Sequence, residues 1–329
     1  MHYIIDRFLQ IARNRYAKYT KKKVLIGRFS EDEAQKSANI IYDILTSDQP
    51  CMIARFGLVE ISCLINYLGI QNKQKNPITY ISGKTNAWWW THKTRHEMIN
   101  NAGFFPITPA ALTRFCELLL QDMSQIDILA SWRIEELILD SKMSPVSKIP
   151  IIHLEPYFAK SPWTRALEGK NILVIHPFVN QIKRQFQNNR LKLFKDSQIL
   201  PKFNILTLRA IQSIGGETNG FDSWFDALDY MKAEMDKINY DICIIGCGAY
   251  GFHLAAHAKR KGKKAIHMGG ATQLLFGIKG NRWENSQYGV SEWGLPEGFY
   301  SNIFNEYWIK PGNEGRPQKA DQVEGACYW

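Results

Sequence analysis

The chain has 329 residues and a mass of 38.0 kDa, and 45% of its residues are hydrophobic and 12% aromatic. This composition excludes a globally disordered chain and allows one large α/β domain or two small ones. The formal net charge of +10 is uneven, because residues 1–30 contain eight cations and one acid, Asp6. The rest of the chain is only mildly basic and contains no nucleic-acid-reading motif, so we expect no nucleic-acid partner.

The sequence also lacks the usual signals for insertion or secretion. No apolar run approaches the roughly 18 residues that a membrane-spanning helix needs, and the N-terminus lacks the apolar core of a secretory signal. Six scattered cysteines form no C-x-x-C pair, which favours reduced thiols. These observations predict a cytoplasmic protein.

Residues 1–29 form a predicted basic, amphipathic leader helix. Its apolar residues fall near helical spacing: Ile4, Ile5, Phe8, Leu9, Ile11, Ala12 and Tyr16. One interpretation is that residues 1–23 lie on an anionic membrane surface, which would make the protein peripheral on the inner membrane face. The other is that the helix docks on the domain and is followed by a solvated lysine run.

Residues 30–165 form the predicted N-terminal α/β half. Ser30 and Glu33 are spaced as a capping box before a helix, and the apolar run "CMIARFG" from Cys51 predicts a strand. A helix should follow and close at Gly69. Thr108 and Pro109 predict the start of a second strong helix. "IDILASW" and "IPIIHLEPY" then predict two further strands.

Residues 166–310 form the predicted C-terminal Rossmann-like half, and residues 311–329 a tail. Strands at "NILVIHPF", "FNILTLRA", "YDICIIGCG" and "KKAIHMGG" alternate with helical stretches. Such alternation predicts an α/β fold with a doubly wound, mostly parallel sheet and helices on both faces. The region after about Gln273 reads as aromatic and loop-like.

The stretch "DICIIGCGAYGFHLA" contains a G-x-G-x-x-G turn between a strand and a helix, through Gly246, Gly248 and Gly251. Such a turn cradles the pyrophosphate of a dinucleotide when an acidic residue follows about 20 residues later. Here that position is His267, with no acid nearby. A site for phosphate at a helix N-terminus remains, and a tight packing turn is the structural alternative.

Several strand ends carry residues suited to chemistry. They are Arg55 to Gly57 with Glu60, His176, the glycine turn, and His267 to Gly270. Because ligands bind at the carboxyl edge of an open parallel sheet, these segments are expected to line one crevice.

These segments resemble motifs of the GT-D fold glycosyltransferases. "MIARFGLVEI" is similar to their R-F-G-D-G-E motif, "LEGKNILVIHPF" to a mid-chain segment, and "DICIIGCGAYGFHLAAHAKRKGKKAIHMGG" to their final strand–turn–helix–strand. The likeness spans about residues 50–280. The overall pattern also resembles proteins of bacterial surface-polysaccharide and glycan biosynthesis.

The resemblance implies a site for a nucleotide-sugar donor. Its catalytic candidates are Glu60, His176 and His267. The residues expected to bind the donor are Arg55, Gly57, Gly246, Gly248, Ala249, Tyr250, Gly251, Gly269, Gly270 and Gln273. The candidates for a general base on an acceptor hydroxyl are His176, Glu60 and Glu155.

The chain departs from the family pattern at three points. Leu58 stands in place of the motif's aspartate, Val59 in place of its second glycine, and the last motif reads His267-Met268-Gly269-Gly270. The missing carboxylate argues against a divalent metal, which needs oxygen ligands. Arg55 or a protonated His267 would then neutralise the leaving diphosphate.

Other clusters have mainly structural interpretations. The pairs His92/His96 and His253/His257 have a zinc-compatible spacing without the intervening Glu of a zinc protease, so packing is favoured. Trp88 to Trp90 could stack on sugars, although alternate members of such a run more often face a core. Lys279, Arg282 and Trp283 could close over a donor or lie on the surface.

The sequence therefore predicts a glycosyltransferase that moves a sugar from a nucleotide-diphosphate donor to a glycan acceptor. Two alternatives stay open. One is a Rossmann-type NAD(P)-dependent oxidoreductase or epimerase, favoured by the glycine turn alone. The other is a non-catalytic nucleotide-sugar-binding protein, favoured by the missing aspartate.

Overall fold

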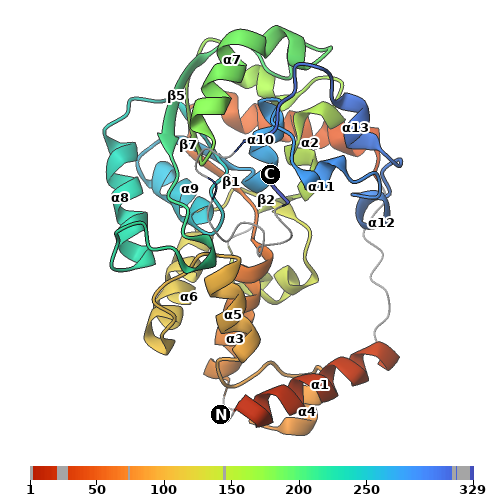
Figure 1. Ribbon diagram of the computed structural model, residues 1–329, viewed down its shortest axis with the longest axis vertical. Coiled ribbons are helices and arrows are strands. Elements are labelled where there is room, and N and C mark those ends of the chain that lie inside the picture. Colours follow the sequence, from red (N-terminus) through yellow and green to blue (C-terminus); the bar gives the residue numbers. More distant parts are fainter. Residues whose placement is uncertain (1–2, 21–28, 73–74, 144–145, 313–315, 317–326) are drawn as a thin grey trace.

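The computed structural model describes residues 3–20, 29–72, 75–143, 146–312, 316 and 327–329. Within these residues, seven parallel strands form one sheet in the order β3-β2-β1-β7-β6-β4-β5. The strands are β1 (Cys51–Ala54), β2 (Ile128–Ser131), β3 (Ser147–Pro150), β4 (Asn171–His176), β5 (Asn204–Arg209), β6 (Ile242–Ile245) and β7 (Lys264–His267). This sheet, with helices on both faces, confirms the predicted doubly wound α/β fold (Figure 1).

The central strands are apolar because both of their faces are covered. Successive residues alternate between two cores: Leu173 and Ile175 of β4 pack on one side, and Ile172 and Val174 on the other. The sheet joins the two predicted halves of the chain, because β1 pairs with β7, for example Met52 with Ala265.

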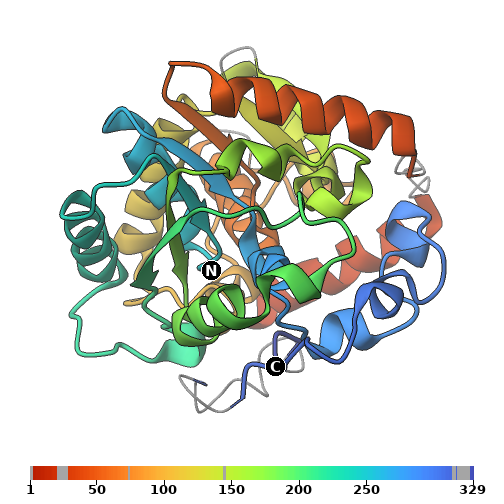
Figure 2. The ribbon, with the colours of Figure 1, turned by 90° about the horizontal axis from the view of Figure 1, so that it is seen from above.

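Helices cover both faces of the sheet. Four main helices contribute to the first core: α3 (Leu58–Gln71), α6 (Pro109–Met123), α8 (Trp224–Asp236) and α9 (Tyr250–Arg260). The second core is formed by α2 (Glu31–Thr46), α7 (Val179–Leu193) and shorter helices near the C-terminus. Figures 1 and 2 show α8 on the side of the molecule away from the C-terminal helices.

Local signals set most helix starts as predicted. The Ser30 hydroxyl accepts the Glu33 N–H at the start of α2, and Thr108 caps α6, which has Pro109 in its first turn. The predicted end of α3 at Gly69 is wrong, because the helix continues to Gln71. A Cβ at Gly69 would lie 2.4 Å from the Ala87 carbonyl oxygen, so this glycine allows close packing.

Two other segments differ from the prediction. Only the start of "IPIIHLEPY" is a strand, because β3 ends at Pro150 and Ile151–Leu154 form a 3₁₀ turn. The region after Gln273 is less irregular than expected. It contains α10 (Thr272–Leu275), α11 (Asn281–Glu284), α12 (Val290–Trp293) and α13 (Phe299–Ile303).

The leader forms α1 (Tyr3–Thr20). With α4 (Pro77–Ile81), α1 lies at one end of the long axis, and α3 and α5 (His92–Asn100) lie between them and the sheet (Figure 1). The basic positions Lys21, Lys22, Lys23 and Arg28 and most of the predicted tail lie outside the described residues. Among the described helices, none is long and apolar enough to cross a membrane. All six cysteines are free and buried, as expected of reduced thiols.

Candidate functional site

The sheet topology brings the predicted strand ends together. The strands β1, β7, β6 and β4 are consecutive neighbours, so their carboxyl ends meet at one edge. Two cavities open there, one of about 110 Å³ and one of about 390 Å³. We call them the narrow and the wide cavity. They share the lining residues Arg55, Asn101, Gly248, Gly270 and Tyr328, so they are two halves of one site.

The three glycines of the turn have different structural roles. A Cβ on Gly246 would lie 2.6 Å from the Gly269 carbonyl oxygen, and one on Gly251 would lie 2.4 Å from the Nε2 atom of His267. Both therefore permit close packing behind the site. Gly248 has φ of +57° and open space where a Cβ would be. It is the glycine that leaves room for a ligand, at the start of α9.

His176 lines the narrow cavity as a neutral imidazole. Its Nδ1 atom accepts the backbone N–H of Phe178 at 3.0 Å, so the neutral ring carries its proton on Nε2. Burial lowers the pKa of His176 to about 3. His176 can therefore donate a hydrogen bond in the site, but it is too weak a base for proton abstraction near neutral pH.

His267 does not fill the role predicted for it. Its side chain is buried beneath Gly251, and it lines neither cavity. Burial, followed by the nearby Arg55 charge, places the pKa of His267 well below its usual value. The prediction of a protonated His267 that neutralises a diphosphate is therefore wrong, because a buried imidazole beside a guanidinium stays neutral.

Arg55 lies at the junction of the two cavities and lines both. Its Nη1 atom donates to the carbonyl oxygen of the adjacent Phe56 at 3.2 Å. Gly269 makes room for the guanidinium, because a Cβ there would lie 2.4 Å from the Nη2 atom of Arg55. Gly269 also has φ of +65°. Gly269 was predicted to bind the donor, but it lines neither cavity, so its structural role is to make space for Arg55.

Gly57 and Glu60 form one local unit at the start of α3. The carboxylate of Glu60 folds back over Gly57, and its Oε2 atom lies 1.9 Å from where a Gly57 Cβ would be. This fold-back explains the spacing in R-F-G-x-x-E, because only glycine leaves space for the carboxylate. A carboxylate is also stabilised at the positive end of a helix. Both residues line the wide cavity.

The donor atoms near this unit do not fit a divalent metal. Leu58 lies between Gly57 and Glu60 in the sequence, is 43% exposed, and lines the wide cavity with an aliphatic side chain. Among the described residues, no group of three or more His, Cys, Asp or Glu is arranged to hold a metal ion. Hard cations require several oxygen ligands at one point, so we assign no step to a metal.

Glu155 is the titratable group in the wide cavity best suited to proton transfer. The hydroxyls of Tyr157 and Tyr300 donate to its carboxylate, the latter at 3.3 Å. Burial raises the pKa of Glu155 to about 7, although the two hydrogen bonds oppose this rise. A base with a pKa near the operating pH is well matched to accepting a proton from an acceptor hydroxyl.

Several residues from the C-terminal region line the wide cavity, Arg282 and Trp283 among them. Arg282 lines it, and its Nη2 atom lies 3.1 Å from the sulfur of Cys327. Its guanidinium carbon lies 4.9 Å from the centroid of the Tyr328 ring, a cation–π contact. Trp283 also lines the cavity, whereas Lys279 lines neither half and pairs with Glu284 at 3.3 Å.

Tyr328 was not predicted, because nothing in the local sequence marks it. Its ring lies against Gly270, where a Cβ would be 2.2 Å from the Cε1 atom of Tyr328. The buried Gln273 donates to the Tyr328 carbonyl oxygen at 3.2 Å. Gly270 and Gln273 both line the narrow cavity, and together they fix Tyr328 between the two halves.

The remaining predicted residues, Ala249 and Tyr250, lie in the wall of the narrow cavity. The Tyr250 hydroxyl makes a 2.7 Å hydrogen bond with Ser213, and its ring stacks on Trp224 with centroids 4.7 Å apart. These contacts make Tyr250 a rigid part of the wall.

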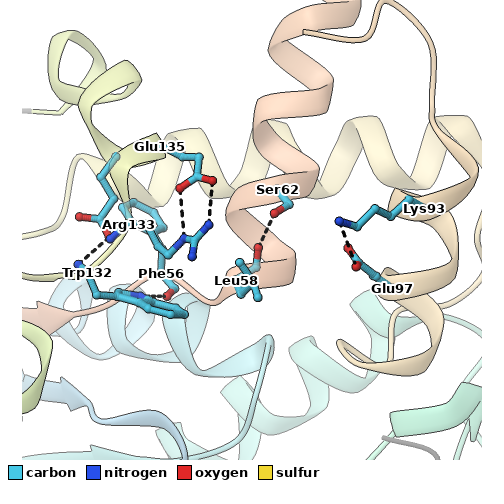
Figure 3. Close-up of polar contacts among 9 residues, drawn as sticks. Phe56, Leu58, Ser62, Lys93, Glu97, Trp132, Arg133 and Glu135 are labelled. Carbon is cyan, nitrogen blue, oxygen red and sulfur yellow. Dashed lines mark hydrogen bonds and ion pairs between the residues drawn. The ribbon is translucent and has the colours of Figure 1, made fainter. Parts of the chain in front are cut away.

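A third cavity of about 510 Å³, here called the rim cavity, adjoins the wide cavity. Trp132, Ile151, Ile152 and Trp293 line both. The indole N–H of Trp132 donates to the carbonyl oxygen of Phe56 at 2.9 Å, which connects the rim to the β1 loop (Figure 3). Beside it, Arg133 makes an ion pair with Glu135 at 2.8 Å (Figure 3).

The other predicted clusters lie away from these cavities. His253 bonds to Asp122 at 2.7 Å and His257 to Asp236 at 2.8 Å, so each is held by its own carboxylate. The rings of His92 and His96 stack with centroids 6.2 Å apart. Trp88 and Trp89 pack with Tyr80 instead of lining the site.

Comparison with known proteins adds little to this geometry. No family model matches the sequence, and no curated protein matches it. A solved structure described as the selenomethionine-substituted structure of a domain of unknown function 1792 (DUF1792) is similar over 79% of this chain and 82% of that chain. The identity is 13% and the TM-score 0.32. A score this low carries no argument about the site.

Proposed function

We propose that the protein is a glycosyltransferase that moves a sugar from a nucleotide-diphosphate donor to a glycan acceptor. The observation that carries this proposal is the position of Arg55 where a narrow cavity, whose other lining side chains are neutral, joins a wide cavity with further charged side chains. A nucleotide-sugar has the same order of parts: a nucleoside, a diphosphate and a sugar.

The narrow cavity suits the nucleoside. Its walls are largely apolar and aromatic, and include Phe178, Tyr250 and Ile214. The Nε2–H of His176 and the Ser213 hydroxyl provide a small number of polar contacts, as is usual for ligand sites. The end of β7 carries His267 where a dinucleotide site has an acidic residue for the ribose, which argues against the oxidoreductase alternative.

The diphosphate would bind at the junction. Arg55 can pair with two phosphate oxygens at once, and the open space at Gly248 lets the backbone at the start of α9 approach the phosphate. Arg282 supplies a second guanidinium in the wide cavity. These cations would stabilise the negative charge that develops on the leaving diphosphate.

The sugar and the acceptor hydroxyl would meet in the wide cavity. Glu155 accepts the hydroxyl proton as the acceptor oxygen bonds to the sugar and the diphosphate leaves. The acceptor would enter through the rim cavity, where Trp132 and Trp293 offer aromatic surfaces next to the wide cavity. Sugars commonly bind by stacking on such surfaces because aromatic rings bury much apolar area.

Isothermal titration with UDP-, GDP- and CMP-sugars tests donor binding, and sugar transfer to an oligosaccharide panel tests catalysis. We expect one diphosphate donor to bind and Arg55→Ala to weaken it. Binding without transfer would favour the non-catalytic alternative. If no nucleotide-sugar binds while NAD stabilises the protein, the oxidoreductase alternative replaces this proposal.

A further inference from the structure

The leader helix α1 docks on the body through its polar side chains. The buried carboxylate of Asp6 accepts the backbone N–H of His92 at 2.7 Å. On the same side, the Nη1 atom of Arg13 donates to the carbonyl oxygens of Tyr80 and Thr85 at 3.0 and 2.7 Å. The apolar Leu9 of α1 is buried in this contact and belongs to one cluster with Tyr80 and Trp89.

Five other apolar residues of α1 point outward instead. Ile4 is 76% exposed and Phe8 is 68% exposed, and Ile5, Ile11 and Tyr16 are also exposed. On a helical wheel these positions form one sector opposite Asp6 and Arg13. Ile78 of α4, which packs beside α1, is another exposed apolar residue. An ordinary surface helix buries its apolar stripe and exposes its polar face. In α1 the apolar sector is exposed and the polar side chains of Asp6 and Arg13 make the contact with the body.

Cations lie within and beside the exposed sector. Arg7 and Arg15 are exposed, and both fall within or beside the apolar sector on the wheel. Residues 1–30 contain eight cations and one acid, and that acid, Asp6, is turned inward. An apolar helix face flanked by Arg and Lys is typical of helices that lie in the interface of an anionic bilayer, where the long cationic side chains reach the headgroups.

We propose that α1 binds an anionic membrane surface, with Ile4, Phe8 and Ile11 in the boundary between headgroups and acyl chains. The charges favour lipid over a second copy of the chain. A two-fold contact between identical faces would bring the same arginines together, whereas anionic headgroups complement them. This inference does not depend on the proposed function.

The position of α1 relative to the site is fixed by hydrogen bonds. Asp6 and Arg13 attach α1 to the segment 80–92, and the Asn66 side chain of α3 donates to the carbonyl oxygens of Ala87 and Trp89 in that segment. The same helix α3 begins at the wide cavity. Membrane binding would thus hold the site in a defined orientation to the bilayer.

Flotation of the full-length protein with vesicles tests this proposal. We expect binding to vesicles of phosphatidylcholine with phosphatidylglycerol and little binding to phosphatidylcholine alone. Phe8→Asp should reduce the vesicle partition coefficient by about tenfold or more, since a buried Phe side chain contributes that much. Arg7→Gln with Arg15→Gln should reduce it by a similar factor at low salt.

Leu191→Asp is the matched control, because Leu191 is 67% exposed on α7, far along the chain from α1. It should leave binding unchanged, and all variants should keep the wild-type melting temperature, since the docking contacts of Asp6 and Arg13 are intact. The proposal is overturned if Phe8→Asp and the wild type bind the vesicles equally. It is also overturned if the wild type binds equally to vesicles with and without phosphatidylglycerol. A lipid-free dimer that Phe8→Asp dissociates would assign the face to a second copy instead.

Discussion

The two halves of the site differ in charge although they share a wall. The narrow cavity has neutral polar groups, His176 among them, whose pKa of about 3 keeps the ring uncharged near neutral pH. The wide cavity contains Arg282, Glu60 and Glu155, and burial raises the pKa of Glu155 to about 7. Burial thus has opposite consequences for function: it removes His176 as a base and makes Glu155 a better one.

From this difference we expect the two cavities to have different functions. The half with neutral groups can recognise a ligand without changing charge near neutral pH, and the half with charged groups can carry proton transfer and stabilise a leaving group. Arg55 belongs to both. Substitutions in the wide cavity should therefore change rates and pH dependence, and substitutions at the junction should change donor affinity.

The largest effect is expected for Glu155→Gln. Removing a general base typically lowers the rate by about 10²-fold or more, so kcat should fall by that factor while the donor Kd changes little. In the wild type, the rate should fall as pH drops below about 7, because the carboxylate becomes protonated. The transfer rate against pH measures both effects.

Tyr300→Phe provides a finer test of the same group. The Tyr300 hydroxyl donates to Glu155 and thereby lowers its pKa. Without that donor, the acid limb of the rate profile should move to higher pH. If the acid limb of the rate profile does not move in Tyr300→Phe, Glu155 is not the general base. The same conclusion follows if the acid limb persists in Glu155→Gln.

At the junction, Arg55→Ala should weaken donor binding by about 10- to 100-fold, the range for a lost hydrogen bond to a charged group. Titration calorimetry with the donor measures it. Arg95→Ala, an exposed arginine of α5 that lines neither cavity, is the control and should bind as the wild type does. If both variants bind the donor with equal affinity, Arg55 does not bind the diphosphate.

In the narrow cavity, His176 should affect acid stability. Its folded pKa of about 3 lies below the unfolded value of 6.5, so the unfolded state binds more protons and stability falls as pH drops through this window. At pH 5 this loss is about 2 kcal/mol. His176→Gln should reduce the difference between the unfolding free energies at pH 7 and pH 5. If this free-energy difference is the same in His176→Gln and in the wild type, the His176 ring is not buried in its neutral form.

The smallest effect is expected at Gly248. Gly248→Ala places a methyl group in the junction and should weaken donor binding by about tenfold, with a strain of roughly 1–2 kcal/mol because φ is +57°. Gly262→Ala is matched, because Gly262 has φ of +74° and open space around it but lines neither cavity. Both variants should lose a similar unfolding free energy, and donor binding should weaken in Gly248→Ala alone.

The sequence predicted the strands and main helices well, because alternating apolar runs and caps such as Ser30 and Thr108 are local signals. It could not give the strand order, which depends on long-range pairing, such as β1 with β7. Gly69 was misread for the same reason: a glycine inside a helix resembles a helix end until its distant neighbour, Ala87, is known.

The site was predicted in part. Arg55, Gly57, Glu60, His176 and Gly248 do line the cavities, because strand ends of a parallel sheet converge. His267 follows the same rule but is covered by α9 at Gly251, which no local pattern reveals. Tyr328 and Arg282 reach the site from the C-terminal region, and the pKa of Glu155 depends on burial that only the fold creates.

The most direct test of the account is a crystal structure of the protein with a nucleoside diphosphate. We expect the nucleoside in the narrow cavity beside His176, and the diphosphate between Arg55 and the backbone at Gly248, with its terminal phosphate toward Arg282. A diphosphate bound elsewhere, or a nucleotide that leaves Arg55 without a phosphate contact, would contradict it.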